Sequence, residues 1–585
     1  MGTIRYTLAT NNPSAHYFDV EISASNLKGN TIKVIMPVWA PGSYLVREFS
    51  RNIQNFKAFG RKGRLLNVLK TAKNVWKVET KGEDSCRITY RVYAFEMGVQ
   101  TSYLDEERAT VNGSSVFCYI DGRETENVQL EIKPYKKFKK ISTGLERQGN
   151  LFVAENYDQF IDSPIEVGNQ QIYSFTINGK QHEVSICGSG NLNSTKFVAD
   201  VKKIVGAAGT VFGEYPYQRY VFIVHLVSEK GGGLEHSNSS MIKLQRWGFK
   251  SRTDYLQQLA LVAHEIFHLW NVKRIRPEQL TNYDYQKENY TELLWVSEGL
   301  TSYYENEILR RAKIYSTEEF LEALLEDIEF VEGMPGRRVQ SLEEASYDAW
   351  IKHYRQNENT PNSSVSYYAK GAVIGWMLDM EAKRKARSLD DIMRLLYRET
   401  YKRGRGFGSE ALQKACGKVC GDLDSFFADY VRGVKNIDYG RWFGYAGLAL
   451  KPSKREGGFL GIKLKAEGGK FCVASVMQNG PAQRAGIYAN DEIISFNGFR
   501  ANEKLYERFA ETKPDSTIPL IISRDERVLS IEIKVGEYPK LQFMLQKIKN
   551  PTKEQRGFFE NWLGRRWEEP MKLMQREIPQ ERRWI

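Results

Sequence analysis

The sequence lacks several features that would assign the protein to a particular class. It has six cysteines in 585 residues, too few and too scattered for the disulfide framework of small secreted domains. No apolar run approaches the roughly 18 residues that a helix needs to cross a bilayer. The segment Met1–Pro13 lacks the charged start and apolar core of a secretory signal. We therefore expect a cytoplasmic protein with reduced thiols, although a chain trimmed of a signal and exported would look the same.

The features of a nucleic-acid-binding protein are also absent. The net charge is +12, but the 84 Lys and Arg and the 72 Asp and Glu are interspersed rather than gathered in one run. The chain has no zinc-finger spacing, no RNA-binding aromatic motif and no basic heptad segment. Such a charge distribution is typical of a basic solvated surface. We therefore expect no nucleic-acid partner.

The residue pattern changes along the chain in a way that predicts a multidomain α+β protein. A length of 585 residues suggests about four domains and more than one hydrophobic core. Residues 1–178 alternate apolar and polar over short runs, which predicts an N-terminal antiparallel β domain. Residues 179–452 combine strands with later helices, and residues 453–538 form a compact β-rich unit. Residues 539–585 are predicted as a partly helical tail, with a docking helix around Lys553–Trp567.

The stretch Ala263–Trp270, A-H-E-I-F-H-L-W, gives the clearest chemical signal. Apolar residues recur through it at helical spacing. Positions four apart lie one above the other on a helix, so His264 and His268 point to the same side. This H-E-x-x-H pattern predicts two zinc ligands with Glu265 as the general base. A pattern of five loosely constrained residues can also occur by chance. The prediction of a zinc site therefore requires a third ligand elsewhere in the sequence.

Catalytic zinc takes three protein ligands and leaves one position for water. A second helical stretch, Trp295–Tyr304, carries Glu298 in apolar and aromatic surroundings. A lone carboxylate there would be costly unless it were paired or bound to metal. Glu292 and Glu305 lie close by and are competing candidates. From the residues alone the third ligand stays open, since a helix-surface carboxylate explains Glu298 equally well.

The runs His264–Pro277 and Trp295–Thr301 together resemble the glycyl aminopeptidase family of gluzincin metallopeptidases. In that family the Glu of the W-x-x-E-G motif is the third zinc ligand, so the resemblance implies Glu298 and one Zn²⁺ per chain. It also implies a thermolysin-like α/β catalytic domain with a helical lobe. The stretch Pro37–Arg47 resembles the hallmark of the family's N-terminal domain. It contains no obvious catalyst, and we interpret it as a rigid turn with packed aromatic residues.

Three glycines precede an acidic residue in Gly231–His236, G-G-G-L-E-H. Glycines allow close backbone approach, as in an edge strand beside an extended peptide, although a flexible turn alone explains the run better. The stretch resembles the exopeptidase motif of related aminopeptidases, whose Glu holds the free α-amine of the substrate. The resemblance implies substrate binding by Gly232, Gly233 and Glu235. The departure from the G-A-M-E-N form of the larger aminopeptidase family leaves the detailed amine contacts open.

Tyr368–Gly371 resembles the Y-x-K-G stretch that carries the catalytic tyrosine of related gluzincin aminopeptidases. A phenol hydroxyl aimed at the developing oxyanion would stabilise it opposite the metal, which predicts a catalytic role for Tyr368. Tyr367 is the alternative donor, because adjacent helix residues point about 100° apart and only one can face the metal. A packed aromatic residue without a catalytic role is the third interpretation.

Near the C-terminus, Gly458–Leu464, Asn479–Gly486 and Asn490–Gly498 together resemble a PDZ domain of the bacterial protease type. In PDZ domains the amides of the L-G-I turn bind a peptide carboxylate and the edge strand pairs with the peptide. The implied peptide groove consists of Leu460, Gly461 and Ile462. A domain that only packs on the catalytic lobe is the alternative.

Together these patterns predict a zinc-dependent aminopeptidase that acts on peptides with a free N-terminus. The resemblance implies a small first residue, Gly or Ala. The alternative is an endopeptidase, or a proteolysis-linked scaffold whose PDZ domain recruits C-termini. A non-catalytic peptide-binding module is disfavoured, because the metal ligands and the general base are all present.

Overall fold

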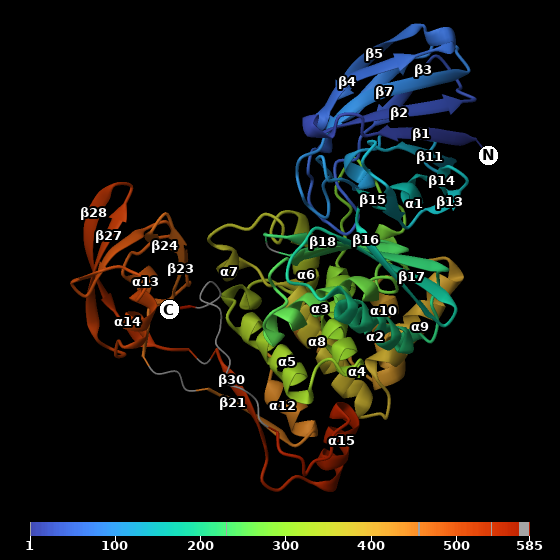
Figure 1. The fold of residues 1–585 in the computed structure, drawn as a ribbon. Coiled ribbons are helices and arrows are strands. Elements are labelled where there is room, and N and C mark those ends of the chain that lie inside the picture. Colours follow the sequence, from blue (N-terminus) through green and yellow to red (C-terminus); the bar gives the residue numbers. More distant parts are fainter. Residues whose placement is uncertain (1, 230, 454–456, 540, 572–583) are drawn as a thin grey trace. The chain divides into compact units, whose positions relative to one another are not determined.

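The computed structural model describes the chain except for residues 1, 230, 454–456, 540 and 572–583 (Figure 1). Internal contacts divide the chain into two units. The first joins Met1–Thr291 with Tyr304–Ile314 and Met393–Gly408, and the second joins Glu292–Tyr303 with Tyr315–Ile392 and Ser409–Ile585. The four domain boundaries expected from the residue pattern stay a prediction.

The first unit begins with an eleven-stranded sheet of order β10-β3-β6-β5-β4-β7-β2-β1-β11-β14-β13. β1 (Thr3–Ala9) pairs in parallel with β11 (Asn127–Lys133), and the other described pairs are antiparallel. Alternate residues of β2 are buried, as expected for a strand with one face on a core. The predicted mainly antiparallel N-terminal β domain is thereby confirmed. The other strands are β2 (Tyr17–Ser25), β3 (Thr31–Ile35), β4 (Ile53–Phe59), β5 (Leu65–Ala72), β6 (Val75–Glu79), β7 (Ser85–Tyr93), β10 (Tyr119–Ile120), β13 (Glu146–Gln148) and β14 (Leu151–Ala154).

A smaller sheet and a short helix complete the N-terminal region. The sheet has the order β12-β15-β9-β8, and the helix is α1 (Tyr157–Ile161). Asn156 caps α1 by accepting a hydrogen bond from the Gln159 amide, and Asp162 follows at its C-terminal end. The four strands are β8 (Tyr103–Leu104), β9 (Arg108–Val111), β12 (Lys140–Thr143) and β15 (Ile165–Gly168).

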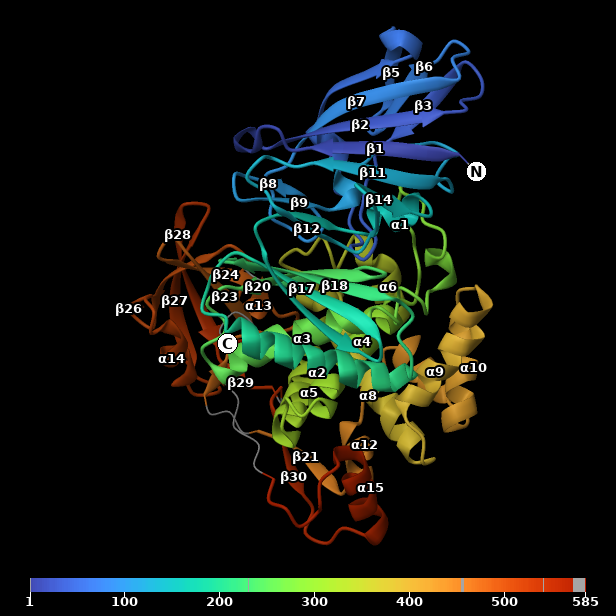
Figure 2. The ribbon, with the colours of Figure 1, turned by 45° about the vertical axis from the view of Figure 1, so that its right-hand side comes forward.

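A mixed five-stranded sheet of order β16-β17-β18-β20-β19 carries the helix with the H-E-x-x-H motif. β17, β18 and β20 are parallel neighbours, and β18 is buried along most of its length, as expected for a central parallel strand. α2 (Ser194–Phe212) makes the crossover from β17 to β18. α2 packs on α3 (Arg252–Phe267) (Figure 2). α3 also contacts β19 and β20. The strands are β16 (Gln171–Ile177), β17 (Lys180–Cys187), β18 (Arg219–Val227), β19 (Gly232–Glu235) and β20 (Ser239–Gln245).

Helices dominate the middle of the chain. A π-helical turn, η6 (Trp295–Gly299), runs into α4 (Leu300–Arg311). α8 (Tyr367–Lys383) is the central helix of the second unit, because it contacts η6, α5, α6, α10 and α12. The expected helical lobe is thereby confirmed. The further helices in this part of the sequence are α5 (Thr317–Glu332), α6 (Leu342–Tyr347), α7 (Thr360–Ser363), α9 (Leu389–Glu399), α10 (Ser409–Cys420), α11 (Asp424–Phe426) and α12 (Tyr439–Tyr445).

The PDZ domain has a six-stranded sheet with the path β23-β24-β25-β27-β28 and with β26 paired to β25. The sheet encloses a hydrophobic core of its own with residues of α13 and α14. This arrangement confirms the prediction of a PDZ domain. The elements are β22 (Gly458–Phe459), β23 (Ile462–Glu467), β24 (Lys470–Val476), α13 (Pro481–Arg484), β25 (Glu492–Phe496), β26 (Phe499–Arg500), α14 (Leu505–Ala510), β27 (Thr517–Arg524), β28 (Arg527–Lys534) and β29 (Gly536–Glu537).

After the PDZ domain the chain returns to the strand that precedes it. β30 (Phe543–Lys547) pairs antiparallel with β21 (Leu448–Pro452), a pairing that the sequence did not indicate. α15 (Lys553–Leu563) follows within the expected docking helix and ends at Gly564 in the left-handed conformation. Trp562 of α15 is buried and its ring meets Phe320 and Phe443. Part of the predicted tail, residues 540 and 572–583, lies outside the described residues. Among the described helices, none has the length and apolar character that crossing a bilayer requires.

Candidate functional site

His264 and His268 lie at the C-terminal end of α3, and both are buried. His264 Nδ1 lies 2.7 Å from Glu305 Oε2, and His268 Nδ1 lies 2.9 Å from the carbonyl oxygen of Asn271. Because a carbonyl oxygen only accepts hydrogen bonds, Nδ1 of His268 carries a proton, and Nε2 is the ring atom that the neutral imidazole offers to a metal. The carboxylate of Glu305 favours the same tautomer of His264. Metal-binding histidines have this arrangement, with the second ring nitrogen bonded to a carboxylate or a carbonyl.

Glu298 completes a group of three possible ligands. His264, His268 and Glu298 are all buried, and their ligand atoms lie within 4.8 Å of one another. Two imidazoles and one carboxylate form a donor set that suits Zn²⁺ with a position left for water. Glu298 lies in the π-helical turn η6, and such turns often occur at functional sites. The residues present therefore fit a zinc ion, whereas the competing Glu305 contacts the ring of His264.

A second buried group of ligand-type side chains consists of Glu166, Cys187 and His225. His225 Nε2 lies 3.0 Å from Glu166 Oε2, and the same oxygen accepts a hydrogen bond from the Thr110 hydroxyl at 2.6 Å. These contacts join β9, β15 and β18 in a buried polar network. The group shares no residue with the H-E-x-x-H motif.

The carboxylate of Glu265 lies against β19. A Cβ atom at Gly233 would overlap this carboxylate and would lie 2.6 Å from Glu265 Cγ. At the neighbouring Gly232, a Cβ atom would meet no described atom within 4 Å. β19 lies at one edge of its sheet, so the glycine run is an edge strand rather than a flexible turn. The glycine at position 233 provides the space that the Glu265 carboxylate occupies, a constraint that the motif alone did not show.

Glu235, at the end of β19, is buried against the N-terminal motif Pro37–Arg47. Gly42 has a φ of +88°, and a Cβ atom there would lie 2.6 and 2.7 Å from the two carboxylate oxygens of Glu235. The expected turn with packed aromatic rings is present, since Ser43 N donates to Ala40 O and the ring of Trp39 is buried. The motif therefore also positions the Glu235 carboxylate.

Asp162 stabilises the turn at His236 and Ser237, which follows Glu235. Its Oδ1 accepts from Lys273 Nζ at 2.7 Å and lies 3.1 Å from His236 Nδ1. Its Oδ2 accepts from the amide and the hydroxyl of Ser237 at 2.9 and 2.5 Å. Burial raises the pKa of Asp162, but Lys273 and His236 outweigh burial and hold this pKa well below its ordinary value. The sequence did not indicate this network, although Lys273 lies within the run that resembles the peptidase family.

Tyr368 lies in the first turn of α8, which Ser366 caps by accepting from the Ala369 amide. Burial, and after it the negative charge of Glu298, raise the pKa of Tyr368 well above its ordinary value, so the phenol stays protonated. Tyr367 is completely buried, whereas Tyr368 is partly exposed. Of these two tyrosines, Tyr368 is therefore the one that solvent or a substrate reaches.

His353 is a neighbour of Tyr368 that no sequence motif indicated. Its ring centroid lies 5.3 Å from that of Tyr368 and 4.7 Å from that of Tyr367. Burial lowers the pKa of His353 to about 4, against the opposing effect of Glu298. The imidazole is therefore neutral near pH 7, and its stacked ring restricts the orientation of Tyr368.

The glycines of two motifs meet where η6 crosses α8. A Cβ atom on Gly371 would lie 2.7 Å from Gly299 Cα and 2.9 Å from Trp295 O. A Cβ atom on Gly299 would lie 2.7 Å from Tyr367 O. Only glycine allows the two backbones to approach so closely. The crossing therefore fixes Glu298 relative to the first turn of α8.

The backbone amides of the three residues expected to form the PDZ groove contact the same oxygen atom. The amides of Leu460, Gly461 and Ile462 lie 2.9, 2.6 and 3.4 Å from the main-chain oxygen of Ile585. The structure therefore brings together the three groove residues that the L-G-I turn suggested.

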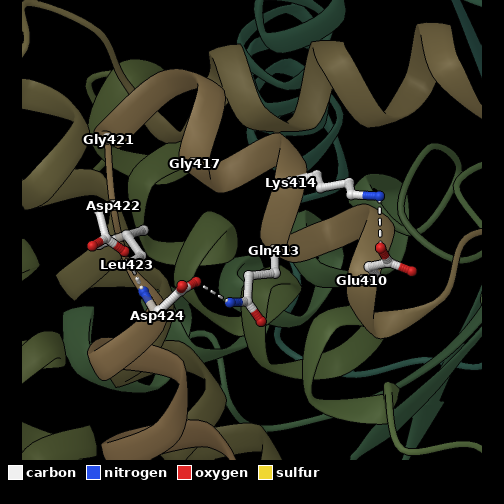
Figure 3. Close-up of a pocket in the computed structure, with 8 residues that line it drawn as sticks. All are labelled: Glu410, Gln413, Lys414, Gly417, Gly421, Asp422, Leu423 and Asp424. Carbon is white, nitrogen blue, oxygen red and sulfur yellow. Dashed lines mark hydrogen bonds and ion pairs between the residues drawn. The ribbon is translucent and has the colours of Figure 1, made fainter.

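One surface pocket lies apart from all these residues. It has a volume of about 500 Å³ and is formed by α10 and the turn into α11 (Figure 3). Lys414 pairs with Glu410 at 2.6 Å and Gln413 donates to Asp424 at 2.6 Å within it. None of the predicted catalytic, metal-binding or peptide-binding residues lines this pocket.

Comparisons with known proteins agree with this architecture. Residues 5–169 match the Peptidase M61 N-terminal domain, residues 257–374 match the M61 glycyl aminopeptidase domain, and residues 458–535 match a PDZ domain. A solved structure of an aminopeptidase N family protein from Idiomarina loihiensis is similar over 96% of this chain and 100% of that chain. The two have a TM-score of 0.90 and 28% sequence identity.

Two curated relatives match only a short part of the chain. The serine endoprotease DegS of Salmonella typhimurium is 44% identical over 69 residues, which is 12% of this chain and 19% of that protein. The serine endoprotease DegS of Escherichia coli K12 is 35% identical over 100 residues, which is 17% of this chain and 27% of that protein. The chain thus combines an M61 N-terminal domain and an M61 glycyl aminopeptidase domain with a C-terminal PDZ domain.

Proposed function

We propose that the protein is a zinc-dependent aminopeptidase that removes small N-terminal residues, Gly or Ala, from peptides. The buried group of His264, His268 and Glu298 carries this proposal, because the hydrogen bonds on both Nδ1 atoms leave Nε2 of each histidine as a ligand. A bound Zn²⁺ would supply Lewis acidity toward the scissile carbonyl and would lower the pKa of its water. The preference for a small first residue rests on the family alone.

Glu265 is the proposed general base. Its carboxylate accepts a proton from the attacking water and delivers it to the leaving amine. The structure supports this role because β19 borders the carboxylate at Gly233, and an edge strand can pair with the backbone of an extended peptide. The general base thus lies beside the strand on which a peptide substrate would bind.

Tyr368 is the proposed donor to the oxyanion that forms when water attacks the carbonyl. Its raised pKa keeps the hydroxyl protonated, and its partial exposure leaves it within reach of a substrate. Its electrostatic coupling to Glu298 supports a position near the metal ligands. Such a donor is typically worth roughly 3 kcal/mol of transition-state stabilisation.

Glu235 is the proposed receptor for the α-ammonium group of the substrate. A carboxylate and an ammonium form a charge-assisted hydrogen bond, which is stronger than a neutral one. Gly42 packs against both carboxylate oxygens and so fixes the side chain at the end of the edge strand. Binding of the substrate amine there would place the first peptide bond, rather than an internal bond, at the reacting groups.

The test is hydrolysis of peptide pairs that begin with Gly, Ala or Leu, each with a free and an acetylated N-terminus, with and without a chelator. We expect hydrolysis of the free Gly and Ala peptides, loss with the chelator, and little cleavage of the acetylated peptides. Glu235→Ala should lower kcat/KM for the free peptides far more than for the acetylated ones. Equal cleavage of both forms by the unmodified protein would instead identify an endopeptidase.

A further inference from the structure

The turn that binds a peptide carboxylate in PDZ domains donates hydrogen bonds here to a main-chain oxygen of the same chain. The amides of Leu460, Gly461 and Ile462 lie 2.9, 2.6 and 3.4 Å from the main-chain oxygen of Ile585. Gly461 has a φ of +78°, a conformation that glycine adopts without strain. Successive amides in such a turn form a concave anion-binding site. The turn therefore binds Ile585 in the way that it would bind the end of a peptide.

The amide of Ile585 also bonds to the first residue of the edge strand β23. This amide donates to Ile462 O at 2.9 Å, and β23 lies at the edge of the sheet. The side chain of Ile585 is 3% exposed and belongs to the core cluster that contains Leu460 and Leu505. Full burial of an aliphatic side chain of this size is worth roughly 1.5–3 kcal/mol. Main-chain pairing and a filled apolar pocket are the two elements of peptide recognition by strand addition.

Trp584 connects the occupied groove with the helical lobe. Its side chain is buried, and its Nε1 donates to Gly333 O at 2.7 Å, at the C-terminal end of α5. Its carbonyl oxygen accepts from the Tyr538 hydroxyl at 3.0 Å, and Lys463 Nζ lies 4.9 Å from the ring centroid. A buried indole usually pairs its N–H. The last two residues are thus held on both their main-chain and side-chain atoms.

A second contact between the PDZ domain and the helical lobe does not involve the last residues. Asn362 of α7 donates from Nδ2 to Val476 O at 2.8 Å and accepts at Oδ1 from the Gln478 amide at 2.9 Å. This pair of hydrogen bonds can persist when the groove is empty. Release of Trp584 and Ile585 would therefore open the groove without removing every contact of the domain.

We propose that Trp584 and Ile585 are an intramolecular ligand of the PDZ groove. The groove accordingly recognises peptide C-termini in which an aromatic residue precedes a branched aliphatic residue with a free carboxylate. A partner peptide of this kind must displace the chain's own residues, which also breaks the hydrogen bond between Trp584 and Gly333. This inference is independent of the proposed peptidase activity.

The test is binding of a fluorescent peptide with the sequence Q-E-R-R-W-I and a free carboxylate, with the C-terminal amide of the same peptide as control. It compares the full chain with a chain that lacks Trp584 and Ile585, with Ile585→Asp, and with a chain extended by one glycine after Ile585. A tethered ligand has an effective concentration in the millimolar range, so removing it should strengthen peptide binding by roughly tenfold or more. Ile585→Asp and the chain extended by glycine should show the same gain in peptide affinity. The peptide with a C-terminal amide should bind weakly to all four proteins.

Hydrogen exchange over residues 460–462 gives a second readout that does not depend on the peptide. These amides should exchange slowly in the full chain, should exchange faster in the three altered chains, and should be protected again by the free-carboxylate peptide. Equal peptide affinity of the full and shortened chains would overturn the proposal. So would equal binding of acid and amide, or unchanged exchange after removal of the last two residues. Thermal unfolding shows in parallel whether each altered chain is folded.

Discussion

Gly299 and Gly371 lie backbone against backbone, and a Cβ atom on either would enter the main chain of the other's helix. Gly299 directly follows Glu298, and Gly371 lies one helical turn after Tyr367 and Tyr368. The two glycines thus explain why the W-x-x-E-G motif and the Y-x-K-G motif, far apart in the sequence, each end in glycine. Their contact aligns the predicted third ligand with the first turn of α8.

Gly371→Ala should therefore destabilise the protein and reduce metal retention. The added methyl group meets backbone rather than a mobile side chain, so we expect a loss of about 1–3 kcal/mol in the free energy of unfolding. Gly417→Ala in α10 is the matched control, because a Cβ atom there would meet no described atom within 4 Å. The control should be neutral or more stable, since alanine is the better helix former. Urea unfolding of both variants checks the prediction, and equal stability would show that the crossing tolerates a side chain.

Gly233→Ala should impair Glu265 specifically. A methyl group at position 233 would overlap the Glu265 carboxylate and displace it, so we expect kcat to fall at least tenfold while zinc stays bound. Gly232→Ala on the same strand is the comparison, because its Cβ atom would meet no described atom within 4 Å and would leave the Glu265 carboxylate in place. We expect kcat near normal, and any effect of its proposed place in the substrate-binding strand should appear in KM. Peptide hydrolysis with parallel zinc analysis measures both. Similar kcat values for the two variants would mean that the position of the Glu265 carboxylate does not depend on a glycine at position 233.

Tyr368→Phe should lower kcat by about a hundredfold with little change in KM and with zinc retained, because only the oxyanion donor is lost. Tyr367→Phe should have a much smaller effect, since Tyr367 is completely buried. Steady-state kinetics on a free Gly peptide distinguishes the two. If the hundredfold loss of kcat occurred in Tyr367→Phe rather than in Tyr368→Phe, Tyr367 would be the oxyanion donor.

The elements with local signals could be predicted from the sequence. The helix with His264 and Glu265 follows from apolar spacing, and the PDZ turn at Leu460–Ile462 follows from a short motif. His353 and Asp162 could not be found in this way, because neither lies in a pattern and each acts through residues distant in the chain. The packing of Gly42 on Glu235 and the pairing of β21 with β30 are likewise long-range contacts that no spacing specifies.

The ion pair of Asp162 and Lys273 should contribute stability that depends on pH. Because the folded-state pKa of Asp162 is lowered, its contribution is complete above the unfolded-state pKa of about 3.9 and is lost as the pH falls below it. Asp162→Asn leaves Lys273 buried without its charged partner, which typically costs about 3–5 kcal/mol at pH 7. The difference between the two proteins should shrink below about pH 4.

Urea unfolding at pH 7, 5 and 3.5 measures this difference. The double variant Asp162→Asn with Lys273→Met is the control, and it should be more stable than Asp162→Asn alone because no buried charge is left unpaired. If the difference in the free energy of unfolding between the unmodified protein and Asp162→Asn stayed constant from pH 7 to pH 3.5, Asp162 would not be a source of pH-dependent stability.

The zinc content of the purified protein, measured by elemental analysis beside its variants, tests the proposed metal centre most directly. We expect one zinc per chain, and loss of zinc in His264→Ala, His268→Ala and Glu298→Ala. Glu265→Gln should keep the zinc yet lose turnover, because an amide cannot accept a proton from water. Full zinc occupancy in Glu298→Ala, or near-normal turnover in Glu265→Gln, would contradict the proposed centre.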